Sequence, residues 1–276
     1  MEQSRLKTME TLSKFALVDR VAIVTGSGMG IGKGIALDFA KVGAHVVIAE
    51  LDAKLGKATV EEVHALDRRA LPIAVDVLDS EQVKGLVDKT MAEFGRIDIL
   101  VNCVGGHGGT LVPLEEVSED LWGSVIDFNL KGTFLCSKMV SRVMMAQRRG
   151  NIINLASGAA TRPWPDMVAY GTAKAGVVNF TQTLAVHLAP YNIRVNCIAP
   201  GFTPTLGAGV AVSAEHVEKY GIPLGRLGRP EDMALAAIYL ASDASDYVTG
   251  VTIDVRGGPF LGKVMLESAE ENWQKK

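Results

Sequence analysis

The chain has 276 residues, 48% of them hydrophobic, and a formal net charge of −3 at pH 7. This length suits one large domain or two small ones, and the hydrophobic share is enough for a sizeable core. A net charge this close to zero gives no electrostatic reason to expect a nucleic acid or an anionic membrane as partner.

The spacing of the cysteines and the N-terminal sequence indicate in which cellular compartment the protein is expected. The three cysteines, Cys103, Cys136 and Cys197, lie far apart in apolar runs, which favours buried reduced thiols over disulfides or a metal site. Residues 1–10 lack the continuous apolar core of a secretion signal, and no window approaches the roughly 18 apolar residues that span a bilayer. We therefore expect a cytoplasmic protein with no bound metal, and a loosely held N-terminal arm over residues 1–15.

Short apolar runs alternate with helical periods from residue 21 onward. The runs predict strands at 21–25, 45–49, 71–75, 97–101, 151–156, 193–198 and 251–255. Helices are predicted from the glycine cluster to residue 40, from the second strand to about 68, and over about 80–94, 118–147, 168–188 and 230–240. Strands that are apolar throughout and alternate with helices predict an α/β fold with a single doubly wound parallel sheet of about seven strands, helices on both faces.

A glycine-rich turn joins the first strand to the first helix. Its pattern is Thr25-Gly26-x-x-x-Gly30-x-Gly32. Small residues here allow a tight turn, let the backbone approach a pyrophosphate, and direct a helix N-terminus at its negative charge. Glycine clusters also occur purely for packing, but the position between a strand and a helix favours a dinucleotide site.

Glu50 ends the second strand, 24 residues after Gly26. A carboxylate at this place accepts hydrogen bonds from the adenosine ribose and repels a 2′-phosphate, and residues 27–29 and Leu51 supply no arginine. The prediction is therefore NAD rather than NADP, with a solvated loop acid as the alternative. Asp76 and Val77, at the end of the third strand, are predicted to meet the adenine, unless Asp76 only caps the next turn.

Tyr170 and Lys174 lie four residues apart on a predicted helix, so their side chains project from one face. Ser157 follows the fifth strand, at the edge of the sheet where open α/β folds place their chemistry. A phenol, an ammonium and a hydroxyl brought together would form an acid–base centre for an alcohol and its ketone. A tyrosine and a lysine with this spacing on a helix are, taken alone, ordinary surface residues.

Taken together, these motifs resemble the short-chain dehydrogenase/reductase family over about residues 16–258. The matching pieces are the glycine turn, Asp76, Asn102-Cys-Val-Gly105, Asn129, Ser157, Tyr170-Gly-Thr-Ala-Lys174 and Pro200-Gly201. Two pieces depart from the family pattern: Asn102-Cys-Val-Gly105 stands for Asn-Asn-Ala-Gly, and Asp254-Val-Arg-Gly-Gly258 for Val-Asp-Gly-Gly. The resemblance implies a Rossmann-like fold, with a substrate lid at about 202–228 and a C-terminal tail at 259–276.

The resemblance also implies a role for each matching residue. Tyr170 would be the general acid/base, with Lys174 lowering the pKa of its phenol and holding the nicotinamide ribose. Ser157 would orient the substrate oxygen, and Asn129 would hold a water in a proton relay. Thr205 would contact the nicotinamide carboxamide. Further cofactor contacts are implied at Ile31, Asn102, Gly105, Pro200, Gly201 and Thr203.

The substrate is expected between three glycine- or proline-rich segments. They supply the candidate substrate residues Gly106, His107, Gly158, Trp164 and Phe202. Trp164 between two prolines suggests a rigid wall for a cyclic or apolar substrate, with packing at the loop base as the alternative. The family pairs the helices near 139–145 and after Tyr170 between subunits, which implies a homotetramer, and the tail is expected to pack on a neighbouring subunit.

Three functions remain open from the sequence. The first is an NAD-dependent dehydrogenase that acts on a secondary alcohol as small-molecule substrate. The second is a 3-oxoacyl thioester reductase of the same family, which would normally prefer NADPH. The third is a non-catalytic NAD-binding protein, which the complete set of Asn129, Ser157, Tyr170 and Lys174 disfavours.

Overall fold

Seven parallel strands form one sheet in the order β3-β2-β1-β4-β5-β6-β7. The computed structural model describes residues 2–108, 111–162, 164–205, 217 and 221–259. The strands are β1 (Val21–Thr25), β2 (His45–Glu50), β3 (Ala70–Ala74), β4 (Ile99–Asn102), β5 (Gly150–Leu155), β6 (Ile193–Pro200) and β7 (Thr252–Val255). Strand order reverses between β1 and β4, which creates a crevice at the carboxyl ends of these strands.

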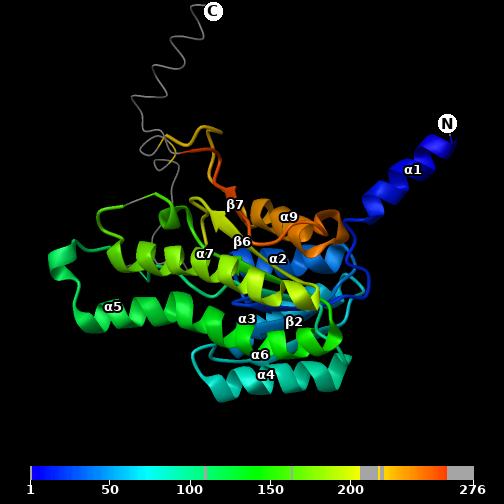
Figure 1. Ribbon diagram of the computed structural model, residues 1–276, viewed down its shortest axis with the longest axis horizontal. Helices are drawn as coiled ribbons and strands as arrows, with labels where there is room; N and C mark the ends of the chain where they lie inside the picture. Colours follow the sequence, from blue (N-terminus) through cyan, green and yellow to red (C-terminus); the bar gives the residue numbers. More distant parts are fainter. Residues whose placement is uncertain (1, 109–110, 163, 206–216, 218–220, 260–276) are drawn as a thin grey trace, which may run out of the picture.

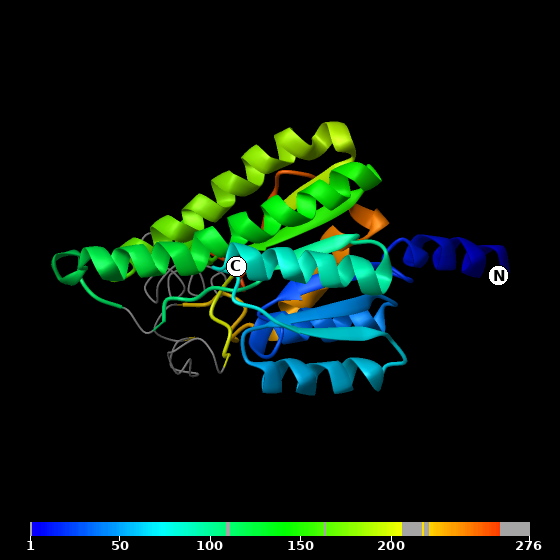
Figure 2. The same cartoon turned by 90° about the horizontal axis from the view of Figure 1, so that it is seen from below.

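Helices cover both faces of the sheet, as Figures 1 and 2 show. One face carries α2 (Gly30–Lys41), α3 (Ala53–His64) and α9 (Pro230–Ala241). The other carries α4 (Ser80–Phe94), α6 (Gly132–Gln147) and α7 (Val168–Leu188). Before α6 come α5 (Glu119–Ile126) and a π-helical turn, η2 (Asp127–Lys131), so that α5, η2 and α6 follow one another as a long rod in Figure 1.

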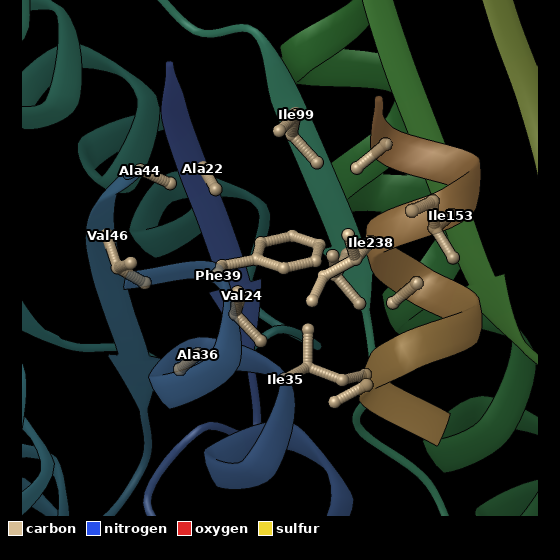
Figure 3. Close-up of a cluster of buried hydrophobic side chains, with 14 of the residues drawn as sticks. Ala22, Val24, Ile35, Ala36, Phe39, Ala44, Val46, Ile99, Ile153 and Ile238 are labelled. Atoms are coloured by element: carbon tan, nitrogen blue, oxygen red, sulfur yellow. The ribbon is translucent and has the colours of Figure 1, made fainter. Parts of the chain in front are cut away.

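Alternate residues of each strand enter two separate cores. In β1, Ala22 and Val24 face the layer of α2 and α9, whereas Val21 and Ile23 face α4 and α6. Phe39 of α2 is fully buried at the centre of the first core, among the residues labelled in Figure 3. Because both faces are covered, the strands are apolar throughout, which is the pattern that marked them in the sequence.

The predicted single-domain parallel fold is confirmed. The bounds of β1, α4 and α7 are those predicted, and the other strands and α9 differ by one or two residues at an end. The helix after β2 ends at His64, earlier than predicted. The helix predicted over 118–147 contains the π-helical turn η2, a change of backbone winding that leaves no trace in the pattern of apolar residues.

The N-terminal arm differs from the prediction. Residues Glu2–Ser13 form a helix, α1, which projects from the rest of the molecule in Figure 1. The chain joins the body just after it, where Phe15 contacts Tyr239 at a ring-centroid distance of 6.4 Å and the Leu17 N–H donates to Val42. Met9 and Leu12 are exposed on α1.

Two predicted segments fall largely outside the description. Most of the interior of the predicted lid and residues 260–276 of the tail lie outside the described residues. None of the helices in the described part of the chain combines the length and hydrophobicity that crossing a bilayer requires.

Candidate active site

A cavity of about 420 Å³ opens at the carboxyl ends of the central strands. Its walls come from the ends of β1, β2, β4, β5 and β6, the segment after β3, and the first turns of α7. The predicted site residues that line it are Gly26, Gly30, Ile31, Gly32, Glu50, Asp76, Val77, Gly105, Gly106, His107, Ser157, Gly158, Trp164, Tyr170, Lys174, Pro200, Gly201, Phe202, Thr203 and Thr205. Asn102 and Asn129 lie behind this lining.

Backbone conformation and close packing both require glycines in the turn between β1 and α2. Gly26 and Gly30 have φ of +64° and +57°, in the left-handed region that favours glycine. A Cβ on Gly32 would lie 2.1 Å from the Gly26 carbonyl oxygen, so the helix could not pack on the turn. No side chain caps the first turn of α2, whose N-cap residue is Met29. The free N–H groups therefore face a cavity suited to a pyrophosphate.

Glu50 is held by the backbone at the end of β2. One carboxylate oxygen accepts from the Gly28 N–H at 2.8 Å, and the other accepts from the N–H of Leu51 at 2.9 Å. A Cβ on Gly28 would come within 2.8 Å of the same carboxylate. The carboxylate is thus fixed at the wall beside the glycine turn, where the sequence predicted a ribose contact.

Asp76 shapes the turn after β3. Its carboxylate accepts from the Leu78 N–H at 2.9 Å, and its own N–H donates to Gln82 at 3.0 Å. The capping role that the sequence left open is therefore present, while Asp76 and Val77 also line the cavity.

The side-chain amide of Asn102 forms hydrogen bonds within the protein. It is buried at the end of β4, and its amide donates to Ser137 at 3.0 Å and to Asn154 at 2.8 Å. Asn154 in turn donates to Thr181 at 2.9 Å, which links β4, β5, α6 and α7. The side-chain amide of Asn102 is thus held behind the cavity wall, and a cofactor contact at this residue stays a prediction.

Asn129 lies in the π-helical turn, and its side chain hydrogen-bonds the backbone of the loop after β4. Its Oδ1 accepts from the Gly106 N–H, and its Nδ2 donates to the carbonyls of Gly106 and Val125, each at 2.9 Å. A Cβ on Gly105 would lie 2.7 Å from both Asn129 Oδ1 and Lys174 Nζ. Only a glycine therefore lets the loop pass between these two side chains.

Ser157, Tyr170 and Lys174 meet at the floor of the cavity. Ser157 hydrogen-bonds the Tyr170 phenol. The Lys174 Nζ donates to the Leu155 carbonyl at 2.9 Å and lies 5.9 Å from the centre of the Tyr170 ring. The structure thus brings together a hydroxyl, a phenol and an ammonium that come from β5 and α7.

Burial dominates the electrostatics of this group. It raises the pKa of the Tyr170 phenol, against the smaller lowering effect of the Ser157 hydrogen bond. It also lowers the pKa of Lys174 to about 8. The predicted lowering of the Tyr170 pKa by Lys174 together with a bound, positively charged nicotinamide stays a prediction, and in the protein alone burial has the larger effect on this pKa.

The remaining walls come from loops. The rings of His107 and Tyr170 are perpendicular, with centroids 5.9 Å apart. Trp164 and Phe202 form a second edge-to-face pair at 5.8 Å. Thr205 lies against the glycine turn, since a Cβ on Gly30 would come within 2.9 Å of it. Phe128 and Cys103 also line the cavity and were missed. Phe128 belongs to no sequence motif, and Cys103 stands where the Asn102–Gly105 motif departs from the family pattern.

These residues fit a nicotinamide dinucleotide. The uncapped start of α2 suits the pyrophosphate, the fixed carboxylate of Glu50 suits a ribose diol, and Tyr170 and Lys174 suit the reacting end. The described residues contain no group of His, Cys, Asp or Glu arranged to hold a metal ion.

Comparison with known proteins agrees with this geometry. A family profile described as enoyl-(acyl carrier protein) reductase matches residues 26–259. A 3-oxoacyl-[acyl-carrier-protein] reductase from Thermotoga maritima is 39% identical over 243 residues, covering 88% of this chain and 98% of the relative. An NAD-dependent glycerol dehydrogenase from Listeria innocua is 38% identical over 249 residues, covering 88% and 95%.

A solved structure extends the likeness to three dimensions. The 7α-hydroxysteroid dehydrogenase complexed with NADH and 7-oxo glycochenodeoxycholic acid superposes with a TM-score of 0.84 at 32% identity, covering 89% of this chain and 96% of that one. The chain shares its fold with that solved structure, and all three proteins match it over nearly their whole length. The chain is therefore an oxidoreductase that belongs to the short-chain dehydrogenase/reductase family.

Proposed function

We propose that the chain is an NAD-dependent dehydrogenase that interconverts a secondary alcohol, cyclic or otherwise apolar, with its ketone. The observation that carries this proposal is the meeting of Ser157, Tyr170 and Lys174 in the cavity that Glu50 also lines. The protein is expected to work in the cytoplasm.

The roles of the side chains follow from their contacts. NAD, when bound, accepts the hydride of the alcohol carbon. The Ser157 hydroxyl and the Tyr170 phenol are placed to hydrogen-bond the substrate oxygen between them. Tyr170 takes the alcohol proton during oxidation and returns it during reduction. Because burial raises the pKa of Tyr170, the phenol is protonated at neutral pH and is ready to donate during reduction.

Lys174 supports the oxidation of the alcohol, in which Tyr170 accepts a proton. Its pKa of about 8 leaves the ammonium mostly protonated at pH 7, and its charge favours a phenolate when Tyr170 accepts a proton. The Leu155 carbonyl fixes Nζ, and Asn129 fixes the adjacent Gly105–Gly106 backbone. Both N–H donors of the Asn129 side chain are used within the protein, so a relay water held by Asn129 would donate to one of its oxygen atoms.

Cofactor choice follows from Glu50. A 2′-phosphate would meet a carboxylate that three backbone N–H groups hold in place, those of Gly28, Leu51 and Asp52. A like-charge contact of this kind disfavours NADP. The glycerol dehydrogenase relative is named as NAD-dependent, and the hydroxysteroid dehydrogenase was solved with NADH, which supports the same choice.

Reduction of a 3-oxoacyl thioester is the second candidate. It is favoured by the 39% identity to a 3-oxoacyl-[acyl-carrier-protein] reductase. Reaction class alone does not separate the two, because both reactions move a hydride between a nicotinamide and a carbonyl carbon.

One experiment separates the candidates. The purified full chain is assayed at 340 nm with NAD and NADP on a panel of cyclic and linear secondary alcohols, and with NADH and NADPH on acetoacetyl-CoA. We expect kcat/KM to be highest for an alcohol with NAD. A higher kcat/KM for acetoacetyl-CoA with NADPH would overturn the proposal in favour of the thioester reductase.

We also propose a homotetramer. Trp122, Phe128 and Phe134, on the rod of α5, η2 and α6, are each about two-fifths exposed, which is high for large aromatic side chains. Light scattering coupled to gel filtration tests this assembly, and a monomeric mass would contradict it.

A further inference from the structure

The imidazole of His107 lies beside the phenol of Tyr170. Their rings are perpendicular, with centroids 5.9 Å apart, and both line the cavity. His107 comes from the loop after β4 and Tyr170 from α7, so the contact joins two separate elements. A substrate whose oxygen lies between Ser157 and Tyr170 therefore shares the cavity with the His107 imidazole.

The position of His107 is fixed by the residue before it. Both backbone groups of the Gly106 peptide unit are paired with the side-chain amide of Asn129, with donor–acceptor distances of 2.9 Å. Asn129 is itself fully buried in the π-helical turn. A side chain supported in this way has a defined direction, as a residue that recognises a substrate needs.

The strand order gives the substrate space two unlike sides. In the order β4-β5-β6, the loop of His107 and the loop of Phe202 flank the loop that carries Ser157. Phe202 pairs with Trp164 to form an apolar aromatic side. One substituent of the reacting carbon therefore meets aromatic rings, and the other meets an imidazole.

The charge state of His107 narrows the chemistry of that second substituent. Burial lowers the pKa of His107, so the imidazole is neutral at pH 7. A neutral imidazole has one N–H donor and one acceptor nitrogen, which suit a hydroxyl or a carbonyl, and it forms no ion pair with a carboxylate or phosphate.

We propose that His107 determines specificity by hydrogen-bonding an uncharged oxygen on the carbon adjacent to the reacting one. The substrates are then vicinal diols and the matching α-hydroxy ketones, with an apolar remainder against Trp164 and Phe202. Two vicinal oxygens in the gauche arrangement lie about one hydrogen-bond length apart, so one can reach Tyr170 while the other reaches His107. This inference rests on the proposed alcohol dehydrogenase function.

Matched alcohols test the proposal. With saturating NAD, kcat/KM is measured for cis-cyclohexane-1,2-diol, cyclohexane-1,3-diol and cyclohexanol. We expect the 1,2-diol to exceed the other two by about tenfold, the effect of one neutral hydrogen bond. In His107→Leu this preference falls to about twofold or less, through loss of activity on the 1,2-diol alone. His107→Gln, whose amide can still hydrogen-bond, recovers part of it, and His64→Leu on the exposed end of α3 changes nothing.

The outcomes separate this inference from the function on which it rests. Turnover of all three alcohols without preference, or an equal loss on all three in His107→Leu, overturns the role of His107 and leaves the dehydrogenase assignment intact. Absence of NAD-dependent turnover on any alcohol overturns both.

Discussion

The half of the cavity beside β1 and β2 is shaped by backbone, whereas the half beyond β4, β5 and β6 is shaped by side chains. In the first half, positive φ at Gly26 and Gly30 and the missing Cβ of Gly32 make the space, and backbone N–H groups hold Glu50. In the second half, His107, Trp164 and Phe202 stand on loops, where His107 pairs with the Tyr170 ring and Trp164 with the Phe202 ring.

This difference teaches where specificity can change without loss of the fold. Replacement of a backbone-defining glycine disturbs a turn on which a helix rests, but replacement of a loop side chain changes only a wall. The cofactor half is therefore expected to tolerate few substitutions, and the substrate half many. The predictions below separate the two halves.

The largest effect is expected at the junction of the two halves. Tyr170→Phe removes the proton donor and acceptor but keeps the ring, so kcat falls by about 10²- to 10⁴-fold. The Kd for NADH, measured by fluorescence, stays within about twofold. Tyr247→Phe, at a fully exposed tyrosine, is the matched control and keeps full activity. Wild-type turnover in Tyr170→Phe would refute the acid/base role.

Glu50→Arg tests the backbone-defined half. The change replaces a repelling charge by one that pairs with a 2′-phosphate, so the ratio of kcat/KM for NADP to that for NAD rises by about 100-fold. The preference among alcohols stays the same, because Glu50 lies at the other end of the cavity. Glu61→Arg, an equal charge change on the exposed side of α3, leaves the ratio unaltered. An unchanged ratio in Glu50→Arg would remove Glu50 as the selector.

Lys174→Met tests whether the buried ammonium of Lys174 lowers the free energy of unfolding. Burial lowers the pKa of Lys174 to about 8 from 10.5, so below pH 8 the folded state carries a buried charge at full cost. Between about pH 8 and 10.5 only the unfolded chain retains the proton, and wild-type stability therefore gains as pH rises. Lys174→Met, which does not titrate, is expected to raise the free energy of unfolding at pH 7 by about 1 to 3 kcal/mol.

Urea denaturation at pH 7 and pH 9.5 measures this effect. The advantage of Lys174→Met should shrink at the higher pH, while Lys57→Met, at an exposed lysine, shows no such trend. A variant less stable than wild type at pH 7 would mean that the ammonium is a net stabiliser.

Trp164→Ala tests the side-chain-defined half and has the smallest expected effect. Loss of the indole removes apolar contact and the edge-to-face pair with Phe202, so KM for an apolar cyclic alcohol rises about five- to tenfold. The kcat and the Kd for NADH change by less than about twofold. An equal rise in KM for small linear alcohols would instead point to collapse of the loop.

The two halves also differ in how well the sequence predicts them. The glycine turn, Glu50 and the Tyr170–Lys174 pair are local patterns, fixed by a strand end or one helix turn, and the structure brings them to one cavity. The contact between His107 and Tyr170 depends on the strand order and on the hydrogen bonds between Asn129 and Gly106. Neither of these is a local pattern in the sequence.

The features that the sequence did not predict have physical causes of the same kind. The amide of Asn102 donates to Ser137 and Asn154, which come from other elements. Burial, which no local pattern reports, raises the pKa of Tyr170 in the protein alone. Glu2–Ser13 is helical although its residues show no apolar period.

The π-helical turn Asp127–Lys131 amounts to one extra residue within the rod of α5 and α6. Deletion of a single residue, such as Phe128, would restore uninterrupted α-helical phase and rotate everything before it by about 100° relative to α6. Asn129 would keep its place with α6, whereas α5, which precedes the deletion, would turn away from its present contacts with α7. The helical phase of this rod, rather than any one side chain, therefore sets how α5 packs while Asn129 holds the loop after β4.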